Sequence, residues 1–487
     1  MKLSTLPLAE LSVLLDKKEI TPSRLILECL EHIHQLDAEV GAFLTVTEQE
    51  ARDAAAHADK RCADGKRLSP LDGIPYALKD NFVTEGIRTT AGSRMLEHFI
   101  PCTDAAVVDK LRRAGAVLIG KCNMDEFGMG NTTEFSAFRP TRNPLNTMRV
   151  PGGSSGGCAA AVSAGMAVFA VGSDTGGSVR QPAAFCGITG LKPTYGAVSR
   201  NGLIAFASSL DTVGILARKP GDCLLVEHVL SSADPCDMTV HPIPSEQTDG
   251  PLPAIALFLG ADEDKEESPA VRLAFETAVQ RLRAQGCSLH DAPFPDIQSA
   301  LSAYYIISSA EASSNLARYD GIRFGSRAKG CTAIGTLYDR SRADGLGSEV
   351  KRRILLGTYV LSEGSRRAFY DRACRVRETL HAAFDRIFEH AGLILCPTVP
   401  CTAFPADVHR KPVSAYHCDR YTVPASLCGL PSISIPFGLD RDGMPCALQL
   451  IAKAGTDGML CRHAETILHM LSREVSRNDA TYDAAVH

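Results

Sequence analysis

Two glycine-rich runs carry the residues of this chain that are best suited to chemistry. The first run spans Gly152–Gly157 and holds two adjacent serines, and the second spans Asp174–Ser178 and ends on a serine. Because glycine has no Cβ atom, several backbone N–H groups can approach one small reacting oxygen. Clustered N–H donors stabilise the oxyanion that forms during acyl transfer. The two runs therefore predict an acyl-transfer enzyme with a serine nucleophile.

A serine nucleophile needs a neighbouring base, and the sequence offers a lysine for that role. None of the 14 histidines lies in either glycine-rich run. Lys79 ends the apolar run Ile74–Leu78, which is typical of a buried strand. Burial lowers the pKa of a lysine and makes the neutral amine available as a base. We expect a proton relay that joins Lys79, Ser154 and Ser178; the alternative is a strand-end lysine that reaches solvent.

Lys79 and the two glycine-rich runs, in this order, resemble the amidase signature family. The resemblance implies that Ser178 is the nucleophile, that Ser154 follows a cis peptide bond and relays the proton, and that Lys79 is the final base. It gives Ser155 a supporting hydrogen bond, although spacing alone does not distinguish Ser155 from Ser154. The family resemblance also implies an oxyanion hole made by the backbone N–H groups of Thr175, Gly176, Gly177 and Ser178.

Two charged residues flank the second glycine-rich run. Asp174 opens this run, and Arg180 follows it by two positions. Their opposite charges predict an ion pair that fixes the bend of the loop. We interpret both residues, and Gln181-Pro182 after them, as scaffold that supports the chemistry.

Composition and charge exclude several classes of protein. Of the 487 residues, 45% are hydrophobic and 22% are charged, as in an ordinary soluble globular protein. The net charge of −5 provides no basic footprint for nucleic acid on this chain. The longest apolar stretches are too short for a bilayer span, and the first residues lack the apolar core of a signal peptide. We therefore expect a cytoplasmic protein without membrane contact.

The chain has 17 cysteines but no Cys-x-x-Cys pair. Four of them, Cys396, Cys401, Cys418 and Cys428, fall in one region, which raises the question of a metal site. Their spacing fits no zinc ribbon, and in a reducing compartment most would be small buried hydrophobic residues. We expect no metal and no cofactor in this chain.

The elements that position these residues alternate between strand and helix. Val168–Val171 reads as the strand that leads into the second glycine-rich run, and the small residues Cys158–Ala167 read as a tightly packed helix. This alternation predicts an α/β fold. We expect one large domain over residues 1–487, with a mixed central β-sheet covered by α-helices on both faces. Pro242–Pro253 is either a linker or a surface excursion, and we favour the excursion because strands resume after it.

Four further segments resemble one branch of the family, the glutamine-hydrolysing subunits of tRNA-dependent amidotransferases. These segments are residues 123–127, 206–211, 304–316 and 349–358. The resemblance, which runs from about Leu6 to about Lys453, implies hydrolysis of glutamine to glutamate and ammonia. It also implies a large B subunit that binds tRNA and uses ATP and Mg²⁺, and a small C subunit that holds a heterotrimer together. The product would be Gln-tRNA(Gln), and often also Asn-tRNA(Asn).

Glutamine has charged groups that a site must match. Arg353 offers a fork for the α-carboxylate, Asp419 offers an anion for the α-amino group, and Tyr304 adds a hydroxyl. All three positions match the substrate contacts of the family by motif. The catalytic core would then cover about residues 70–220, and the glutamine-recognition segments about 300–440. The alternatives are that Arg353 is surface charge, that Asp419 caps a loop, and that Tyr305 replaces its neighbour.

Two other functions remain open from the sequence. A free-standing hydrolase of another small amide would carry the same serines, so only the further segments argue against it. A nucleotide-binding module could use glycine-rich loops to hold phosphate, but neither run ends in the Gly-Lys-Ser/Thr of a P-loop. The segment Asn131–Phe135 departs from the serine-rich sequence usual in the family, and we expect it near the substrate pocket.

Overall fold

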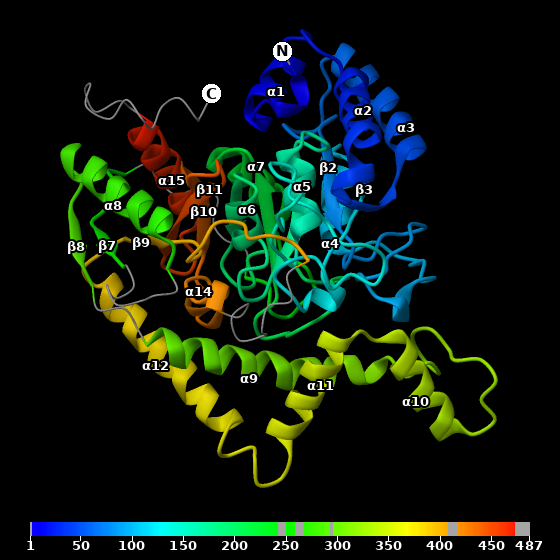
Figure 1. Cartoon of the computed structure of the whole chain (residues 1–487). Helices are drawn as coiled ribbons and strands as arrows, with labels where there is room; N and C mark the ends of the chain where they lie inside the picture. The colour runs from blue at the N-terminus through cyan, green and yellow to red at the C-terminus, as the bar shows by residue number, and fades with distance from the viewer. Residues whose placement is uncertain (1, 242–249, 259–266, 293–295, 408–416, 473–487) are drawn as a thin grey trace.

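One β-sheet runs through the whole molecule in the computed structural model, which describes residues 2–241, 250–258, 267–292, 296–407 and 417–472. Its eleven strands within these ranges follow the order β1-β3-β2-β4-β6-β5-β10-β11-β9-β7-β8 (Figure 1). The strands are β1 Phe43–Val46, β2 Pro75–Lys79, β3 Val117–Cys122, β4 Phe169–Asp174, β5 Thr189–Lys192, β6 Thr212–Ala217, β7 Ile255–Leu257, β8 Leu289–Asp291, β9 Leu393–Pro397, β10 Ser432–Leu439 and β11 Pro445–Ala452.

Helices of very different length connect the strands. They are α1 Leu8–Asp16, α2 Pro22–Val40, α3 Glu48–Ala63, α4 Ala106–Arg113, α5 Gly156–Ser163, α6 Arg180–Phe185, α7 Pro220–Leu230, α8 Pro269–Ala284, α9 Ile297–Asn315, α10 Ile334–Gly345, α11 Ser348–Leu361, α12 Tyr370–Phe388, α14 Val423–Leu427 and α15 Asp457–Ser472. Among the described residues, no helix is both long and apolar enough to cross a membrane.

The sheet is mixed, as predicted. β2 pairs in parallel with both β3 and β4, whereas β4, β5 and β10 pair with their other neighbours antiparallel. β7 returns to this same sheet after the segment Pro242–Pro253, of which residues 242–249 lie outside the described residues. The strands after this segment therefore continue the sheet that holds the glycine-rich runs.

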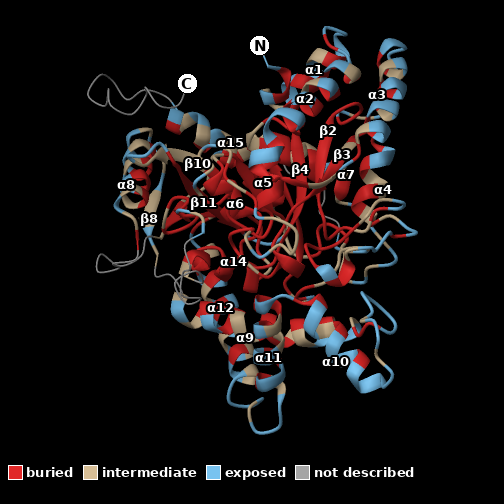
Figure 2. Cartoon of the chain, turned by 45° about the vertical axis from the view of Figure 1, so that its right-hand side comes forward, coloured by how far each residue is buried: buried red, intermediate tan, exposed pale blue. Residues whose placement is uncertain are grey.

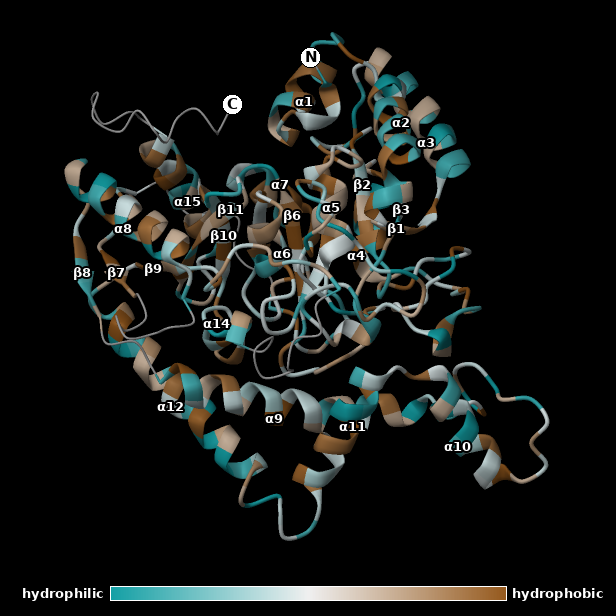
Figure 3. Ribbon diagram, viewed as in Figure 1, coloured by the Kyte–Doolittle hydropathy of each residue, from teal (hydrophilic) through white to brown (hydrophobic). Residues whose placement is uncertain are grey.

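Successive residues of the central strands pack on opposite faces of the sheet. Tyr76 and Leu78 of β2 and Phe169 of β4 pack in one core with α1, α7, α8 and α15. Ala77, which lies between Tyr76 and Leu78, and Ala170, which follows Phe169, pack in a second core with α2, α3 and α5. This alternation shows that helices cover both faces, which confirms the predicted architecture. Figure 2 shows the strands, α5 and α6 buried at the centre, and Figure 3 shows the central strands to be mainly hydrophobic.

The elements around the two glycine-rich runs differ slightly from the predicted ones. The helix predicted at Cys158–Ala167 begins earlier, at Gly156, and ends at Ser163 because Gly165 adopts a left-handed conformation with φ of 70°. The strand predicted at Val168–Val171 continues to Asp174 as β4. The first run therefore leads directly into α5, and the second run begins on the last residue of a buried strand.

Helices α9 to α12 form a layer along one end of the sheet (Figure 1). α9 packs against α11, α12 and α14, and Tyr304, Leu380 and Val423 belong to the hydrophobic core that joins these helices. α9 contains Tyr304 and α11 contains Arg353, two of the residues predicted to bind substrate. The layer therefore carries these two predicted substrate residues to the side of the sheet where the glycine-rich runs lie.

Candidate active site

Parallel pairing of β2 and β4 brings Lys79 to the second glycine-rich run. Leu78 of β2 is in register with Val171 of β4, so the carboxyl ends of both strands lie at the same edge of the sheet. Lys79 ends β2, and Ser173 lies near the end of β4. The Lys79 side chain therefore reaches across from one strand end to the other.

Lys79 is completely buried and makes three polar contacts. Its Nζ atom lies 2.8 Å from Ser154 Oγ, 3.0 Å from Ser173 Oγ and 3.2 Å from the Ser173 carbonyl oxygen. Asn81 also donates a hydrogen bond to Ser173 Oγ, at 2.9 Å. The alternative that Lys79 reaches solvent from a strand end is therefore wrong.

The burial of Lys79 changes its acidity. Loss of solvent lowers its pKa from 10.5 to about 8, because the protonated amine is poorly solvated in the interior. Nearby carboxylates oppose this shift but do not cancel it; they belong to Asp125, Asp174 and Asp211. A substantial fraction of Lys79 is thus neutral near pH 8 and able to accept a proton.

The structure distinguishes the two adjacent serines of the first run. The peptide bond between Gly153 and Ser154 is cis, and the Ser154 hydroxyl lies against Lys79. The Ser155 hydroxyl donates instead to the Ser173 carbonyl, at 3.2 Å, and the Ser155 N–H donates to the Ser178 carbonyl, at 3.1 Å. Ser154 is therefore in position to exchange a proton with Lys79, whereas Ser155 joins the two glycine-rich runs.

Ser178 lies at the edge of a cavity of about 650 Å³, together with Gly176 and Gly177. Within the part of the chain that the structure describes, the backbone N–H groups of these three residues donate no hydrogen bond. In the same part of the chain, the Ser154 and Ser178 hydroxyls are not hydrogen-bonded to each other. Thr175, the fourth residue of the predicted oxyanion hole, donates its hydroxyl to Asp211 at 2.8 Å. Hydrogen bonds between catalytic groups are often long before substrate binds.

Gly177 is required by the conformation of this loop. Its φ of +142° is one that L side chains rarely adopt, and an added Cβ would lie only 2.4 Å from Thr422 Oγ1. The same Thr422 hydroxyl donates to the Gly176 carbonyl at 2.6 Å. The loop is therefore packed closely against the segment that follows Asp419.

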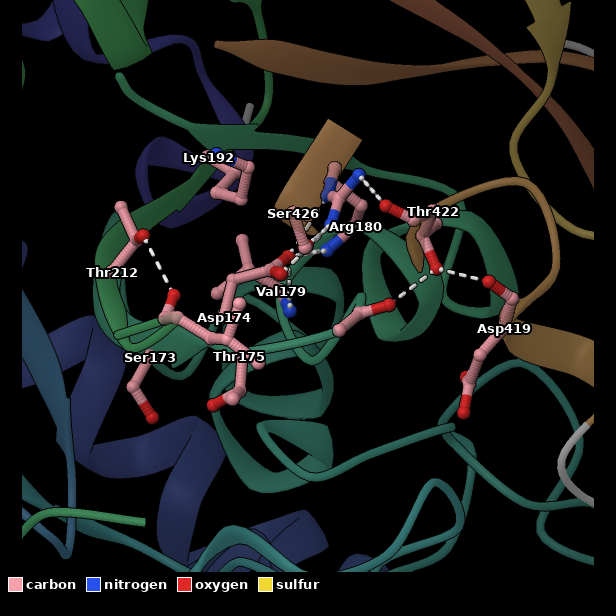
Figure 4. Close-up of polar contacts among 12 residues, drawn as sticks. Ser173, Asp174, Thr175, Val179, Arg180, Lys192, Thr212, Asp419, Thr422 and Ser426 are labelled. Atoms are coloured by element: carbon pink, nitrogen blue, oxygen red, sulfur yellow. Dashed lines mark hydrogen bonds and ion pairs between the residues drawn. The ribbon is translucent and has the colours of Figure 1, made fainter. Parts of the chain in front are cut away.

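Arg180 and Asp174 form the predicted ion pair (Figure 4). Arg180 Nε and one terminal nitrogen donate to the two carboxylate oxygens of Asp174, at 2.9 and 2.8 Å. Arg180 also donates to the Thr422 carbonyl at 2.9 Å and to Ser426 Oγ at 2.7 Å. Burial raises the pKa of Asp174, but the adjacent guanidinium outweighs this effect and leaves the pKa below its usual value.

The cavity beside Ser178 brings the three predicted substrate residues together. Its wall includes the following side chains from α9, α11 and the segment before α14: Tyr304, Tyr305, Glu349, Arg353 and Asp419. Arg353 is only 4% exposed and Asp419 only 9% exposed. Arg353 is therefore no surface charge. The wall thus holds a cation and an anion in the same cavity as the serine predicted to be the nucleophile.

Two neighbouring tyrosines of α9 make different contacts in this cavity. Tyr305 donates its hydroxyl to Asp419 Oδ2 at 2.8 Å, and its ring lies 4.6 Å from the Arg353 guanidinium carbon. The Tyr304 ring packs against Gly176, where an added Cβ would be 2.4 Å from the ring. Tyr304 thus lies beside the loop that ends on Ser178, and Tyr305 lies between the two charges.

Burial raises the pKa of Asp419 to about 7, although the Tyr305 hydroxyl and the Arg353 charge both stabilise its carboxylate. Because the Asp419 carboxylate accepts the Tyr305 hydroxyl and lines the cavity, this side chain does not serve as a loop cap. A carboxyl with a pKa near neutrality changes its charge within the working range of most enzymes.

Three residues of the site were missed by sequence reasoning. Ser173 directly precedes Asp174, and the pairing of β2 with β4 would have placed it near Lys79. Tyr305 was considered only as a substitute for Tyr304. Glu349 lies one helical turn before Arg353, a spacing that favours an ion pair on one helix face.

The remaining sequence features also have definite positions. Asn131 and Phe135 line the cavity, as expected for the unusual segment Asn131–Phe135. All 17 cysteines lie within the described ranges and carry thiols, and the Cys401 and Cys418 sulfurs lie 3.8 Å apart. In the described part of the chain, no group of three or more His, Cys, Asp or Glu side chains is arranged to hold a metal ion.

Comparison with known proteins identifies similar chains over almost the full length. The sequence model of the family described as Amidase matches residues 24–461. The chain is 45% identical over 473 residues to the A subunit of the glutamyl-tRNA(Gln) amidotransferase of Anaeromyxobacter dehalogenans, and the match covers 96% of each protein.

Solved structures show the same likeness in three dimensions. The crystal structure of the A subunit of glutamyl-tRNA(Gln) amidotransferase from Thermotoga maritima matches with a TM-score of 0.78 and 38% identity, covering 95% of this chain and 94% of that one. The structure of 6-aminohexanoate cyclic dimer hydrolase with bound substrate matches with a TM-score of 0.83 and 26% identity, covering 96% and 98%. Proteins with different named substrates thus share this fold.

Proposed function

The chain belongs to the amidase family, and from this premise we propose that it is the glutamine-hydrolysing subunit of a tRNA-dependent amidotransferase. The observation that carries the proposal is the cavity in which Ser178 meets a buried arginine and a buried aspartate. Glutamine presents an amide at one end and a carboxylate and an ammonium group at the other. The 45% identity to an amidotransferase A subunit over nearly the whole chain supports the assignment to this kind of enzyme.

The reaction begins with a proton transfer to Lys79. A neutral lysine amine has two N–H donors and one lone pair, and the three contacts of Lys79 suit this state. The two donors can bind the hydroxyl and the carbonyl of Ser173, and the lone pair can then accept the proton of Ser154. Ser154 in turn takes the proton of Ser178 as that oxygen attacks the glutamine carboxamide.

The attack forms a tetrahedral intermediate whose oxygen carries negative charge. Gly176, Gly177 and Ser178 line the cavity, and their backbone N–H groups would bind this oxyanion, with Thr175 as the fourth donor. The relay then returns a proton to the leaving nitrogen, and ammonia departs. Water hydrolyses the acyl-enzyme on Ser178 by the same relay and releases glutamate.

The charged end of glutamine fits the other side of the cavity. Arg353 can pair with the α-carboxylate and Asp419 with the α-ammonium group, while Tyr304 beside Gly176 can donate a hydroxyl to the bound substrate. This orientation directs the carboxamide toward Ser178. Substrate binding thus uses one residue of each charge, which distinguishes an amino acid from a simple amide.

The ammonia would be used by partner subunits. We assign to this chain a B subunit that binds tRNA and uses ATP with Mg²⁺, and a small C subunit, because the similar chains are A subunits by name. Together they would convert Glu-tRNA(Gln) to Gln-tRNA(Gln), and also Asp-tRNA(Asn) where that substrate is present. This chain itself would need no cofactor, because the relay, the nucleophile and the oxyanion donors are all its own groups.

A free-standing amide hydrolase is the second candidate. It is favoured by the match to 6-aminohexanoate cyclic dimer hydrolase, which has a higher TM-score than the match to the Thermotoga protein. The fold and the serine loops are common to both possibilities. The buried pair Arg353 and Asp419 argues for an amino acid substrate.

One experiment separates the two candidates. The chain is co-purified with B and C subunits and assayed for ATP-dependent amidation of Glu-tRNA(Gln), with either glutamine or ammonium chloride as nitrogen donor. The Ser178→Ala complex should lose amidation with glutamine but keep it with ammonium chloride. Failure of the wild-type chain to support glutamine-dependent amidation in this complex would reject the proposed function.

A further inference from the structure

Glu349 is a buried carboxylate on the wall of the same cavity. It lies in the first turn of α11 and is 4% exposed. Its Oε1 atom accepts a hydrogen bond from Arg353 Nε at 2.8 Å, and its other oxygen binds Arg352. The Arg352 side chain is 49% exposed, so the two arginines differ greatly in their access to solvent.

Arg353 is held from two directions. Glu349 binds the edge of its guanidinium group through Nε, and the ring of Tyr305 lies 4.6 Å from its central carbon. A long arginine side chain loses considerable rotamer freedom when it binds a ligand in one geometry. If that geometry is already fixed in the free protein, ligand binding does not have to order the side chain.

We propose that Glu349 is a positioning residue that orients Arg353 toward the α-carboxylate of the substrate. This inference rests on the proposed function and adds a specificity determinant to it. Glu349 acts through Arg353, whereas Asp419 would contact the α-ammonium group directly. Loss of the Glu349 charge should therefore weaken substrate binding without slowing the steps at Ser178.

The test is a double-mutant cycle of Glu349→Gln and Arg353→Ala, with glutamine hydrolysis as the readout. Glu349→Gln alone should raise KM at least tenfold and change kcat less than twofold. In the Arg353→Ala background, Glu349→Gln should not raise KM further, because the arginine that Glu349 orients is absent. Independent, additive effects on KM would overturn the proposal, as would a loss confined to kcat.

A second substrate tests whether Glu349 contacts the α-ammonium group directly. Glutaramic acid is glutamine without its α-amino group. Glu349→Gln should raise KM for glutaramic acid as much as for glutamine; an unchanged KM for glutaramic acid would overturn the positioning role. Glu349→Asp keeps the charge and should fall between the two enzymes, while Glu363→Gln, on the surface, should match wild type.

Controls separate this inference from the proposed function and from misfolding. Each variant should react with a fluorophosphonate at Ser178 at the wild-type rate, because the relay is intact. Absence of glutaminase activity from the wild-type enzyme would reject the proposed function. A wild-type glutaminase with additive effects in the cycle would reject only the role of Glu349.

The cysteine pair Cys401 and Cys418 supports a second, independent inference. The sulfurs of Cys401 and Cys418 lie 3.8 Å apart, although the residues are 17 positions apart in sequence. Cys401 is partly exposed, and Cys418 is buried directly before Asp419. A disulfide needs a sulfur separation of about 2 Å, so a small movement would allow the bond to form.

We infer that Cys401 and Cys418 form a redox modification site that acts on substrate binding. Hydrogen peroxide would oxidise the pair: the two S–H bonds break, one S–S bond forms, and the peroxide is reduced to two water molecules. The approach of Cys418 to Cys401 would displace the neighbouring Asp419 from the Tyr305 hydroxyl that now binds it at 2.8 Å. Oxidation should therefore raise KM for glutamine, and a dithiol reductant should reverse the change.

Peptide mass spectrometry after peroxide treatment tests this inference. The wild-type enzyme should yield a peptide that links Cys401 to Cys418, and KM should rise at least threefold until dithiothreitol is added. Cys401→Ser should be insensitive, whereas Cys102→Ser, at an exposed cysteine elsewhere, should respond as wild type does. Absence of the linked peptide, or equal sensitivity of Cys401→Ser, would overturn the inference.

Discussion

The side chains of Arg180 and Asp174 are joined by two hydrogen bonds, and neither side chain has any exposure to solvent. The contacts of the pair also extend beyond the loop of Ser178, because Arg180 donates to the Thr422 carbonyl and to Ser426. Thr422 and Ser426 belong to the segment that carries Asp419. One guanidinium group therefore fixes the loop of Ser178 relative to a residue of the substrate cavity.

Arg180→Ala should destabilise the protein strongly. Removal of one partner of a buried ion pair leaves an uncompensated charge, here on Asp174, at a cost of about 3–5 kcal/mol. Urea denaturation should show this decrease in the free energy of unfolding. Arg113→Ala removes an exposed ion pair with Asp109 and should change stability by less than about 0.5 kcal/mol. Equal effects of the two variants would contradict the structural role of the buried pair.

The three serines of the glycine-rich runs should respond differently to replacement by alanine. Ser178→Ala should abolish both glutamine hydrolysis and labelling by a fluorophosphonate, because the nucleophile is lost. Ser154→Ala should slow both by at least about a hundredfold, since proton transfer contributes roughly 10²–10⁴ to the rate. Ser155→Ala keeps the relay and should be the least affected. Labelling of Ser178→Ala at the wild-type rate would reject it as the nucleophile.

Sequence reasoning identified the residues whose chemistry is indicated by the residues next to them in the sequence. The glycine density around Ser154 and Ser178 is visible in a few positions, and Lys79 stands directly at the end of an apolar run. The alternation of strands and helices likewise predicted the mixed sheet covered on both faces. For Ser154, Ser178 and Lys79 the signal lies within a few consecutive positions, and for the sheet it lies in the order of the elements along the chain.

Ser173 and Tyr305 could not be assigned in the same way. The contact of Ser173 with Lys79 depends on the register between β2 and β4, and the two residues are 94 positions apart in sequence. Tyr305 reaches Asp419 across 114 positions, because α9 and the segment before α14 line one cavity. Such contacts arise from packing between distant elements, which no local pattern encodes.

Reactivity of Ser178 should follow the protonation of Lys79. The pKa of Lys79 is lowered to about 8, and only the neutral amine can accept a proton. The rate of fluorophosphonate labelling should therefore rise about tenfold per pH unit below pH 8 and level off above it. Labelling rates measured at a series of pH values on both sides of this pKa give the pH profile.

Lys79→Arg is the matched control for the pH profile. Arginine keeps the positive charge but has no neutral form in this pH range. The variant should label slowly, and its rate should lack the transition seen in the wild-type enzyme. A transition that persists unchanged in Lys79→Arg would show that another group controls the reactivity of Ser178.

Binding of glutamine should depend on a second titration, that of Asp419. Its pKa is raised to about 7, mainly by burial, and only the carboxylate attracts the α-ammonium group of the substrate. KM for glutamine should therefore decrease as the pH rises through this value. The Tyr305 hydroxyl stabilises the carboxylate by a hydrogen bond, so Tyr305→Phe should raise the pKa and move this transition to higher pH.

Tyr304→Phe distinguishes the two neighbouring tyrosines. The ring of Tyr304 packs at Gly176, whereas the hydrogen bond to Asp419 comes from Tyr305. Tyr304→Phe should therefore leave the midpoint of the KM transition in place, even if KM itself increases through loss of a substrate contact. Asp419→Asn should remove the transition altogether. A shift of the midpoint in Tyr304→Phe but not in Tyr305→Phe would reverse the roles of the two residues.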